Sequence, residues 1–163
     1  MLTKFFCKQP DLPELLSMCE HRNGYKREKA VKSLGNLGNP IAISKLIIRA
    51  NDWVPQVRSA ATDAILKLAV SDNAKVFVQH LSEFYHLKKC SRNNNNQLIN
   101  SIESFLLENV EYVLQGIHND NYLIARICVS LTIKNKLINL AKLMEKIITH
   151  PDITIRIKGV FLS

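Results

Sequence analysis

The segment of this chain with the clearest capacity for binding chemistry is a basic stretch near the N-terminus, HRNGYKREKAVK. Arg22, Lys26, Lys29 and Lys32 lie in it, with Glu28 as the acidic residue among them. Residues three or four apart are neighbours on a helix surface, so these cations would form a positive ridge. Such a ridge can bind phosphates or an acidic protein, whereas the simpler interpretation is a solvated helix face.

Nucleic-acid binding through this ridge is an alternative function that the sequence leaves open. Proteins that hold single strands usually place aromatic residues among the cations, and this segment contains only Tyr25. Arg92, Lys88 and Lys89 would add further cations to such a site. A phosphate-binding role predicts an affinity that falls steeply with salt.

Residue spacing does not indicate a metal site, a disulfide framework or a catalytic centre. The histidines form no HExxH motif, and His80 and His86 are six apart, which does not place two ligands on one helical face. The cysteines form no CxxC pair and are predicted to be reduced packing residues: Cys7, Cys19, Cys90 and Cys128. We therefore predict no catalytic, metal-binding or cofactor-binding residue, and no cofactor.

The composition is typical of a folded protein. The chain has 163 residues, 47% of them hydrophobic, and a formal net charge of +8. Residues 1–50 hold nine Lys or Arg against four acidic residues, so the basic excess is concentrated there. Apolar runs are far shorter than the ~20 residues that span a bilayer, and the N-terminal run is too short for a signal peptide. We expect a cytoplasmic protein without a membrane partner.

The elements that must position these residues are predicted to be helices throughout. Helical periodicity occurs along nearly the whole chain, and clusters of Asn, Gly, Pro and Asp separate segments of helical length. His21, His118 and His150 fall at the ends of expected helices, where a cation would complement the helix dipole. The sequence predicts an all-α fold of helix pairs at 11–21 and 25–37, 40–50 and 54–70, 73–88 and 94–107, 109–118 and 121–135, and 137–149 and 152–163.

An Arg followed three residues later by a compact residue recurs along these pairs. The first two copies are 31 residues apart, the last two 30 and the middle two 68, which is two periods with one degenerate copy near Arg92. The copies are Arg27 and Ala30, Arg58 and Ala61, Arg126 and Val129, and Arg156 and Gly159. Such a period predicts an α-solenoid of about five helical hairpins in one domain, 1–163, with repeats near 11–37, 40–70, 73–107, 109–135 and 137–163.

Residues 40–69 show the repeat most clearly. One face of the second helix is predicted to be buried through Val57, Ala60, Ala61, Ala64, Ile65 and Leu68. Ala30–Pro40 and Asp52–Ala61 resemble the short bacterial repeats of the HEAT-repeat family. The resemblance implies a right-handed superhelix whose second helices line a concave face. It also implies a structural ladder between adjacent repeats, made by Asp52, Arg58, Asp120, Arg126, Asp152 and Arg156.

The candidate concave face consists of Ser59, Asp63, Lys67, Ile127 and Leu131. Ile127 and Leu131 in the fourth repeat take the places of Ser59 and Asp63 in the second when the Args are aligned. They would form an apolar patch on the concave surface. Alternatively, that helix is rotated and both residues belong to the core.

Two enzymatic alternatives come from the same resemblance. HEAT-like DNA glycosylases use aromatic and carboxylate side chains around an extruded nucleotide, and Asp52 with Trp53 is the pair that could match. Both lie in an expected turn between helices, where Asp caps and Trp packs, so the structural interpretation is favoured. For a HEAT-like chromophore lyase, no residue beyond the repeat itself gives support.

The C-terminal edge is unusually apolar for the end of a solenoid, which normally carries a polar capping repeat. Its residues are Ile153, Ile155, Ile157, Val160, Phe161 and Leu162. Either the last repeat is truncated from a longer protein, which we favour, or a second copy covers this edge in a homodimer. The predicted function is a non-enzymatic scaffold that binds a protein or peptide on its concave face.

Overall fold

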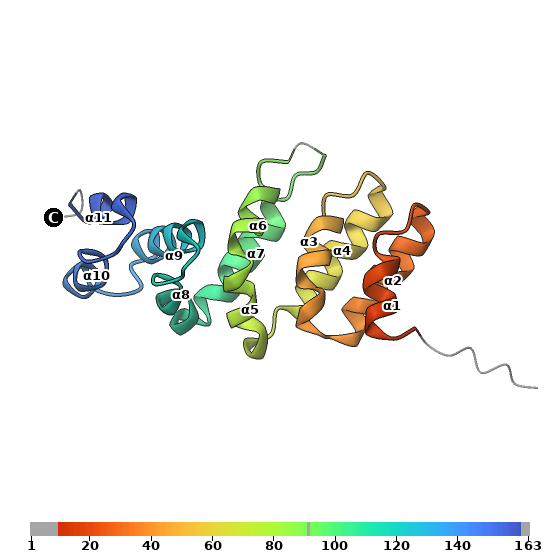
Figure 1. The fold of residues 1–163 in the computed structure, drawn as a ribbon, viewed down its shortest axis with the longest axis horizontal. Helices are drawn as coiled ribbons and strands as arrows, with labels where there is room; N and C mark the ends of the chain where they lie inside the picture. Colours follow the sequence, from red (N-terminus) through yellow and green to blue (C-terminus); the bar gives the residue numbers. More distant parts are fainter. Residues whose placement is uncertain (1–9, 91, 161–163) are drawn as a thin grey trace, which may run out of the picture. The chain divides into compact units, whose positions relative to one another are not determined.

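The computed structural model describes residues 10–90 and 92–160, and every regular element in this part of the chain is helical (Figure 1). There are eleven α-helices and two short 3-10 helices. The all-α prediction is confirmed. The helices form two compact parts, unit 1 (Met1–Leu68) and unit 2 (Ala69–Ser163).

Unit 1 is built from short helices whose ends are marked by polar caps. Asp11 and Asn23 accept hydrogen bonds from backbone N–H groups of the helices that follow them. The second helix ends at Gly38, whose φ of 72° is the left-handed conformation that glycine adopts without strain. The elements are α1 (Leu12–Met18), α2 (Gly24–Leu37), η1 (Pro40–Ala42), α3 (Ile43–Arg49) and α4 (Pro55–Leu68).

The core of unit 1 lies where α2 packs against α4, with α1 against α2 and α3 against α4. The buried face of α4 is the predicted one, from Val57 to Leu68. Small residues bring α2 and α4 very close together. A Cβ atom on Gly35 would lie 2.7 Å from the Cβ of Ala64 and 2.9 Å from its Cα, so this contact has no room for a methyl group.

Replacing Gly35 with alanine is therefore expected to destabilise unit 1 by about 1–3 kcal/mol, because the backbones of α2 and α4 must move apart. The gain in helix propensity from Gly to Ala, at most about 1 kcal/mol, offsets only part of this cost. Denaturant unfolding measures the difference, with Lys29→Ala at an exposed position of the same helix as the control. A Gly35→Ala protein as stable as the parent would contradict the close approach.

Unit 2 contains the remaining helices. The helix α8 packs against three others, α5, α7 and α9, while α9 also contacts α6, and α11 contacts α9 and α10. The elements are η2 (Ser71–Asn73), α5 (Ala74–Gln79), α6 (Leu81–Leu87), α7 (Asn96–Leu107), α8 (Val110–Gly116), α9 (Tyr122–Lys134), α10 (Leu140–Ile147) and α11 (Ile153–Val160).

The prediction of one continuous helix over 73–88 is wrong, because the chain breaks at His80 between α5 and α6. The break brings together aromatic rings that a straight helix would separate. Phe77 and Phe84 are seven residues apart, or ~10.5 Å along a helix axis, yet their parallel rings lie 5.6 Å apart. Phe105 of α7 adds an edge contact at 5.2 Å to Phe77. The break at His80 therefore coincides with the packing of three aromatic rings.

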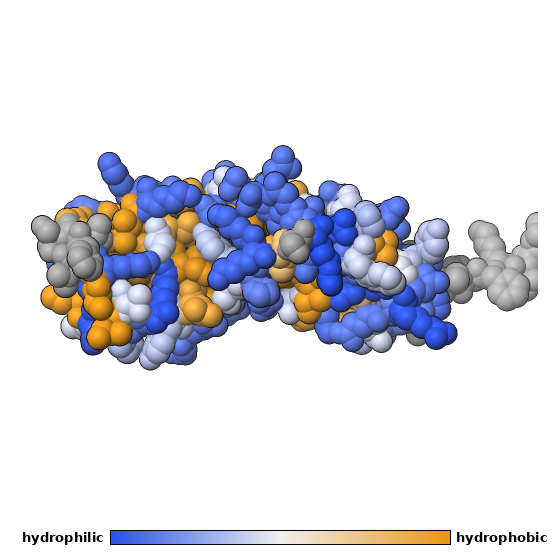
Figure 2. Space-filling model, turned by 90° about the horizontal axis from the view of Figure 1, so that it is seen from above, coloured by the Kyte–Doolittle hydropathy of each residue, from blue (hydrophilic) through white to orange (hydrophobic). Residues whose placement is uncertain are grey.

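The C-terminal part of unit 2 exposes aliphatic side chains, and apolar surface is frequent there in Figure 2. Ile148 is 62% exposed and Ile153 61%, whereas Ile155 is completely buried. Phe161 and Leu162, which the sequence assigned to the same edge, lie outside the described residues. In the described part of the chain, the longest helices have 14 residues, and none combines the length and apolarity needed to cross a membrane.

Candidate functional site

A cavity of about 470 Å³ in unit 2 forms a groove whose charged lining residues are all basic. Three helices line it. The helix α6 and the residues just after it contribute Ser82, Tyr85, His86, Lys88 and Lys89. The second wall consists of Leu123, Arg126, Ile127 and Ser130 from α9, with Lys158 from α11. We call these residues the basic groove.

The wall from α9 follows from where that helix begins. Its cap, Asn121, accepts a hydrogen bond from the backbone N–H of Leu123, so α9 begins at Tyr122. From there, positions three and four apart fall on one face and point towards α6. Arg126, Ile127 and Ser130 therefore lie together on the groove side.

The groove is positively charged, because its lining includes Lys88, Lys89 and Lys158 and no acidic residue, while the charge of Arg126, the fourth cation in the lining, is compensated by Asp152. Lys158 donates a hydrogen bond of 2.6 Å to the Ser130 hydroxyl. Within residues 10–90 and 92–160, no ion pair engages Lys88, Lys89 or Lys158. These ammonium groups are therefore available to an anionic ligand.

Arg126 differs from the lysines because a buried carboxylate holds it in place. Its Nη2 lies 2.7 Å from Oδ2 of Asp152, whose side chain is 1% exposed while that of Arg126 is 40% exposed. Burial alone would raise the pKa of Asp152, but the Arg126 hydrogen bond and the N–H groups of Thr154 and Ile155 outweigh it and keep the pKa below its ordinary value. Asp152 thus anchors a cation at the groove wall without facing the groove.

The opposite wall contains Tyr85, whose phenol donates a hydrogen bond of 2.6 Å to Glu103. Burial and the neighbouring carboxylate raise the pKa of Tyr85, so it stays a neutral donor. Glu103 also pairs with Lys134 at 3.1 Å, and the charge of Lys88, a groove residue, acts on the same carboxylate. The wall therefore offers an aromatic ring whose hydroxyl is held by a carboxylate that is itself paired with Lys134.

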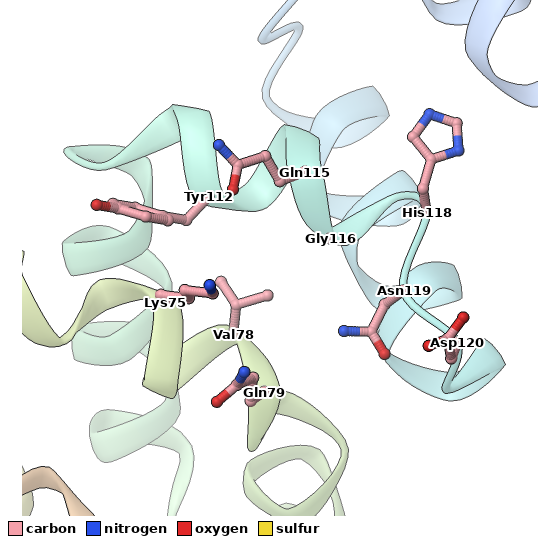
Figure 3. Close-up of a pocket in the computed structure, with 9 residues that line it drawn as sticks. All are labelled: Lys75, Val78, Gln79, Tyr112, Gln115, Gly116, His118, Asn119 and Asp120. Carbon is pink, nitrogen blue, oxygen red and sulfur yellow. The ribbon is translucent and has the colours of Figure 1, made fainter.

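A second cavity of about 290 Å³ lies between α5 and the end of α8 (Figure 3). It is polar but mixed in charge, because Lys75 and Asp120 both line it beside Tyr112, Asn119 and His118. Burial, with smaller effects from Lys146 and His150, lowers the pKa of His118. Within the described residues, no group of His, Cys, Asp or Glu side chains could hold a metal ion. The charges of Lys75 and Asp120 oppose each other in this cavity, whereas the charged residues lining the basic groove are all cations.

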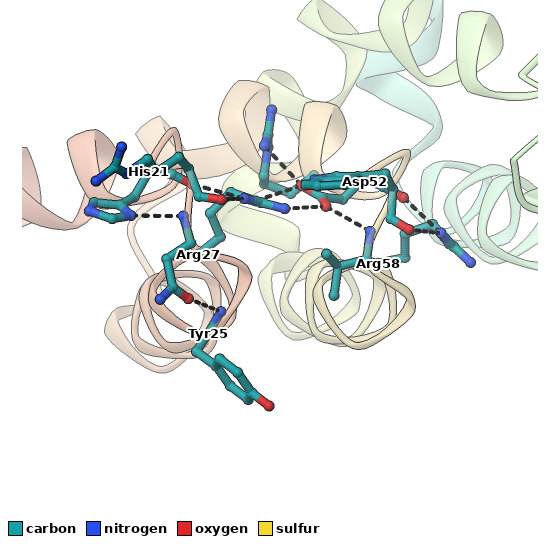
Figure 4. Close-up of polar contacts among 10 residues, drawn as sticks. His21, Tyr25, Arg27, Asp52 and Arg58 are labelled. Carbon is teal, nitrogen blue, oxygen red and sulfur yellow. Dashed lines mark hydrogen bonds and ion pairs between the residues drawn. The ribbon is translucent and has the colours of Figure 1, made fainter.

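The predicted ladder takes a specific form in unit 1, shown in Figure 4. Asp52 accepts a bidentate pair of hydrogen bonds from Arg27, at 2.9 Å from Nε and 2.7 Å from Nη2, with both side chains nearly fully buried. Arg49 adds a third contact to the same carboxylate at 2.9 Å. Arg27 also donates to the carbonyl oxygens of His21 and Arg22, so it joins two successive turns.

The other ladder residues do not all behave alike. Arg58 repeats the backbone contacts of Arg27, since it donates to the carbonyl oxygens of Asp52 and Trp53, six and five residues before it. Arg126 and Asp152 repeat the pairing in unit 2. For Asp120 and Arg156, the described part of the chain provides no ion pair.

The candidate concave residues differ in their exposure in the structure. Ser59, Asp63 and Lys67 are exposed on α4, but Leu131 is only 2% exposed and belongs to the core, while Ile127 is half-buried in the groove wall. The reason is a shift of one residue. Arg27 and Arg58 are the fourth residues of their helices, whereas Arg126 is the fifth of α9. Counted from the helix start, Ser59, Asp63 and Lys67 therefore correspond to Arg126, Ser130 and Lys134.

The basic ridge is exposed as predicted, since Arg22, Lys26, Lys29 and Lys32 all reach solvent. Lys32 pairs with Glu28 at 2.6 Å, which removes it from the free cations. The other three form no ion pair within the described residues.

Two histidines act differently from the dipole-complementing cations expected of them. The Nδ1 atoms of His21 and His150 accept hydrogen bonds from the backbone N–H groups of Asn23 and Asp152, at 2.9 and 3.0 Å. These rings therefore serve as turn-forming acceptors, in the same role as Asp52 towards Val54.

The residues considered for enzymatic chemistry lie in structural contacts. The Asp52 carboxylate is buried against Arg27 and Arg49, and the Trp53 ring lies 5.8 Å from the Arg27 guanidinium. Cys19 and Cys128 are free and buried, and burial raises their pKa values to about 11 and about 12. Neither thiol is a ready nucleophile at neutral pH.

Sequence reasoning missed the basic groove as a unit. The sequence pattern assigned Lys88 and Lys89 only to an extension of the N-terminal ridge, and it assigned no role to Lys158. The available signal was the change in α9 from the pattern of α4, which places Arg126 where Ser59 lies in the earlier helix.

The chain matches no model of a known protein family, and no curated protein matches it.

Proposed function

We propose that this chain is a non-enzymatic binding scaffold of the HEAT type, a right-handed solenoid of helical hairpins that holds a partner protein. The recurring contacts support this proposal. Arg27 pairs with Asp52 across 25 residues in unit 1, and Arg126 pairs with Asp152 across 26 residues in unit 2. Contacts that recur at nearly one repeat length are typical of repeat proteins, which usually function by binding.

The basic groove is the proposed partner site, and its occupant is an acidic segment of another protein. The observation that carries this is a lining without acidic residues in which Lys88, Lys89 and Lys158 form no ion pair within the described residues. Complementary charge gives such an interface its association rate and its specificity. Leu123 and Ile127 lie between the cations, so an aliphatic side chain of the segment can pack there while its carboxylates meet the lysines.

The test is a binding titration with a fluorescein-labelled peptide of alternating Glu and Leu, measured by anisotropy on the full chain at low salt. The double substitution Lys88→Glu and Lys89→Glu is expected to weaken binding roughly tenfold to a hundredfold, because attraction becomes repulsion. Lys142→Glu, at an exposed position of α10, is the matched control and should bind like the parent.

A second peptide with Gln in place of Glu separates charge recognition from apolar adhesion. The proposal requires the Glu peptide to bind much more tightly than the Gln peptide. Failure of the parent protein to bind the Glu peptide, or equal binding by the parent and the Lys88 and Lys89 double variant, would refute the groove as the partner site.

A further inference from the structure

Two aromatic rings of unit 1 stand in solvent, and they face different ways. Tyr25 is 84% exposed and Trp53 is 71% exposed. They belong to turns that touch, because a Cβ atom on Gly24 would lie 3.1 Å from Cγ2 of Val54. The rings therefore come from adjoining turns although they are 28 residues apart in sequence. Figure 4 shows the Tyr25 ring directed away from the polar network beside it.

The Trp53 ring is exposed but not loosely placed. The Arg27 guanidinium lies 5.8 Å from its centroid, within range of a cation–π contact. Arg27 is itself 3% exposed and is held by two hydrogen bonds to Asp52. A buried ion pair thus positions a ring whose surface remains largely free, which is the arrangement of a stacking platform rather than of a core residue.

The charges around these rings leave a positive edge. Three acidic residues of unit 1 are neutralised by ion pairs, Asp52 by Arg27 and Arg49, Glu20 by Lys45, and Glu28 by Lys32, whereas Asp11, Glu14 and Asp63 form no ion pair within the described residues. The remaining cations are Arg22, Lys26 and Lys29, which form no ion pair in the described part of the chain, and Arg58, which donates to backbone carbonyls.

We infer that the surface around Trp53, with the cations Arg22, Lys26 and Arg58, binds single-stranded nucleic acid, with a base stacked on the Trp53 ring and phosphates against the cations. Exposed rings among cations are the arrangement that holds single strands without reading their sequence. In a duplex the base faces are already stacked, so the Trp53 ring favours a single strand. A lipid surface would require aliphatic side chains with the rings, whereas Asn23 and the cations between them are polar.

This inference is independent of the proposed acidic-peptide site, because it concerns unit 1 and a different ligand. Trp53 makes a direct test possible, since it is the only tryptophan in the chain. Titration of the full chain with oligo(dT) or oligo(U) at low salt is expected to quench tryptophan emission as a base stacks on the ring. The affinity should fall steeply as salt is added, because the cations displace counterions from the phosphates.

Two substitutions separate stacking from simple charge attraction. Trp53→Leu should weaken the binding of a labelled oligonucleotide roughly tenfold or more, measured by anisotropy, while Trp53→Phe keeps a ring and should lose much less. The double substitution Arg22→Ala and Lys26→Ala should weaken binding and flatten its salt dependence. Lys67→Ala, near the far end of α4, is the matched control and should bind like the parent.

Three outcomes would overturn the inference. One is an unchanged Trp53 emission at saturating oligonucleotide, which would place any bound strand elsewhere. Another is a Trp53→Leu protein that binds as tightly as the parent. The third is binding to vesicles of anionic lipid, with quenching of Trp53, in the absence of any binding to oligonucleotides.

Discussion

Replacing Asp52 with alanine is expected to lower the free energy of unfolding of unit 1 by roughly 3 kcal/mol. The substitution leaves the Arg27 guanidinium, which is 3% exposed, without its carboxylate. It also removes the acceptor of the Val54 N–H and the partner of Arg49. We place the effect at the lower end of the range for a broken buried pair, because Arg27 keeps the carbonyl oxygens of His21 and Arg22.

Trp53 fluorescence reports on this unfolding, because the only tryptophan in the chain lies in unit 1, beside the substituted residue. Asp52→Asn keeps the size and part of the hydrogen bonding of the carboxylate, so it should destabilise less than Asp52→Ala. Asp63→Ala, at an exposed position of α4, is the control and should change stability by no more than about 0.5 kcal/mol. An Asp52→Ala protein within that margin would show that the pair adds no stability.

The effect of Asp52 should also depend on pH. Burial alone would raise its pKa, but hydrogen bonds from Arg27 and the Val54 N–H, with the charges of Arg27 and Arg49, hold it below the ordinary 3.8. The stabilisation is therefore fully present above pH 3.8 and is lost as the pH falls through the lower pKa of the folded state. The stability difference between parent and Asp52→Ala should shrink in that acid range and stay constant at neutral pH.

Replacing Phe77 with alanine is expected to destabilise unit 2 by about 3–5 kcal/mol. Phe77 is fully buried and contacts the rings of Phe84 and Phe105, so its removal opens a cavity where α5, α6 and α7 meet. The same rings hold the bend at His80, which sets the direction of α6. Loss of Phe77 should therefore also loosen the α6 wall of the basic groove.

The measurement is denaturant unfolding followed by far-ultraviolet circular dichroism, with hydrogen exchange to locate the change in α5–α7. Phe77→Leu fills most of the volume and is the matched control, so it should cost clearly less than Phe77→Ala. If Phe77→Ala and Phe77→Leu are equally stable, the ring contacts do not hold the bend, and another cause of the break at His80 is required.

Several features of the fold could be predicted from the sequence because they depend on local periodicity. The buried face of α4 follows from apolar residues three and four apart, and the start of α2 follows from the capping capacity of Asn23. The orientation of α9 was left between two interpretations. Aligning the Args placed Ile127 and Leu131 on the surface, whereas a rotated helix placed both in the core. Packing against neighbouring helices buries Leu131, leaves Ile127 half-buried and turns Arg126 towards the groove.

The sequence by itself thus determined the helical content and the buried face of α4, since these depend on backbone hydrogen bonding and side-chain direction within one helix. Tertiary structure decided which side chains meet. Three contacts join distant segments of the chain. They are the pairing of Arg27 with Asp52, the position of the Trp53 ring beside Arg27, and the convergence of Lys88, Arg126 and Lys158 in the groove. Such contacts depend on how the helices rotate to bury their apolar faces together, which no local pattern specifies.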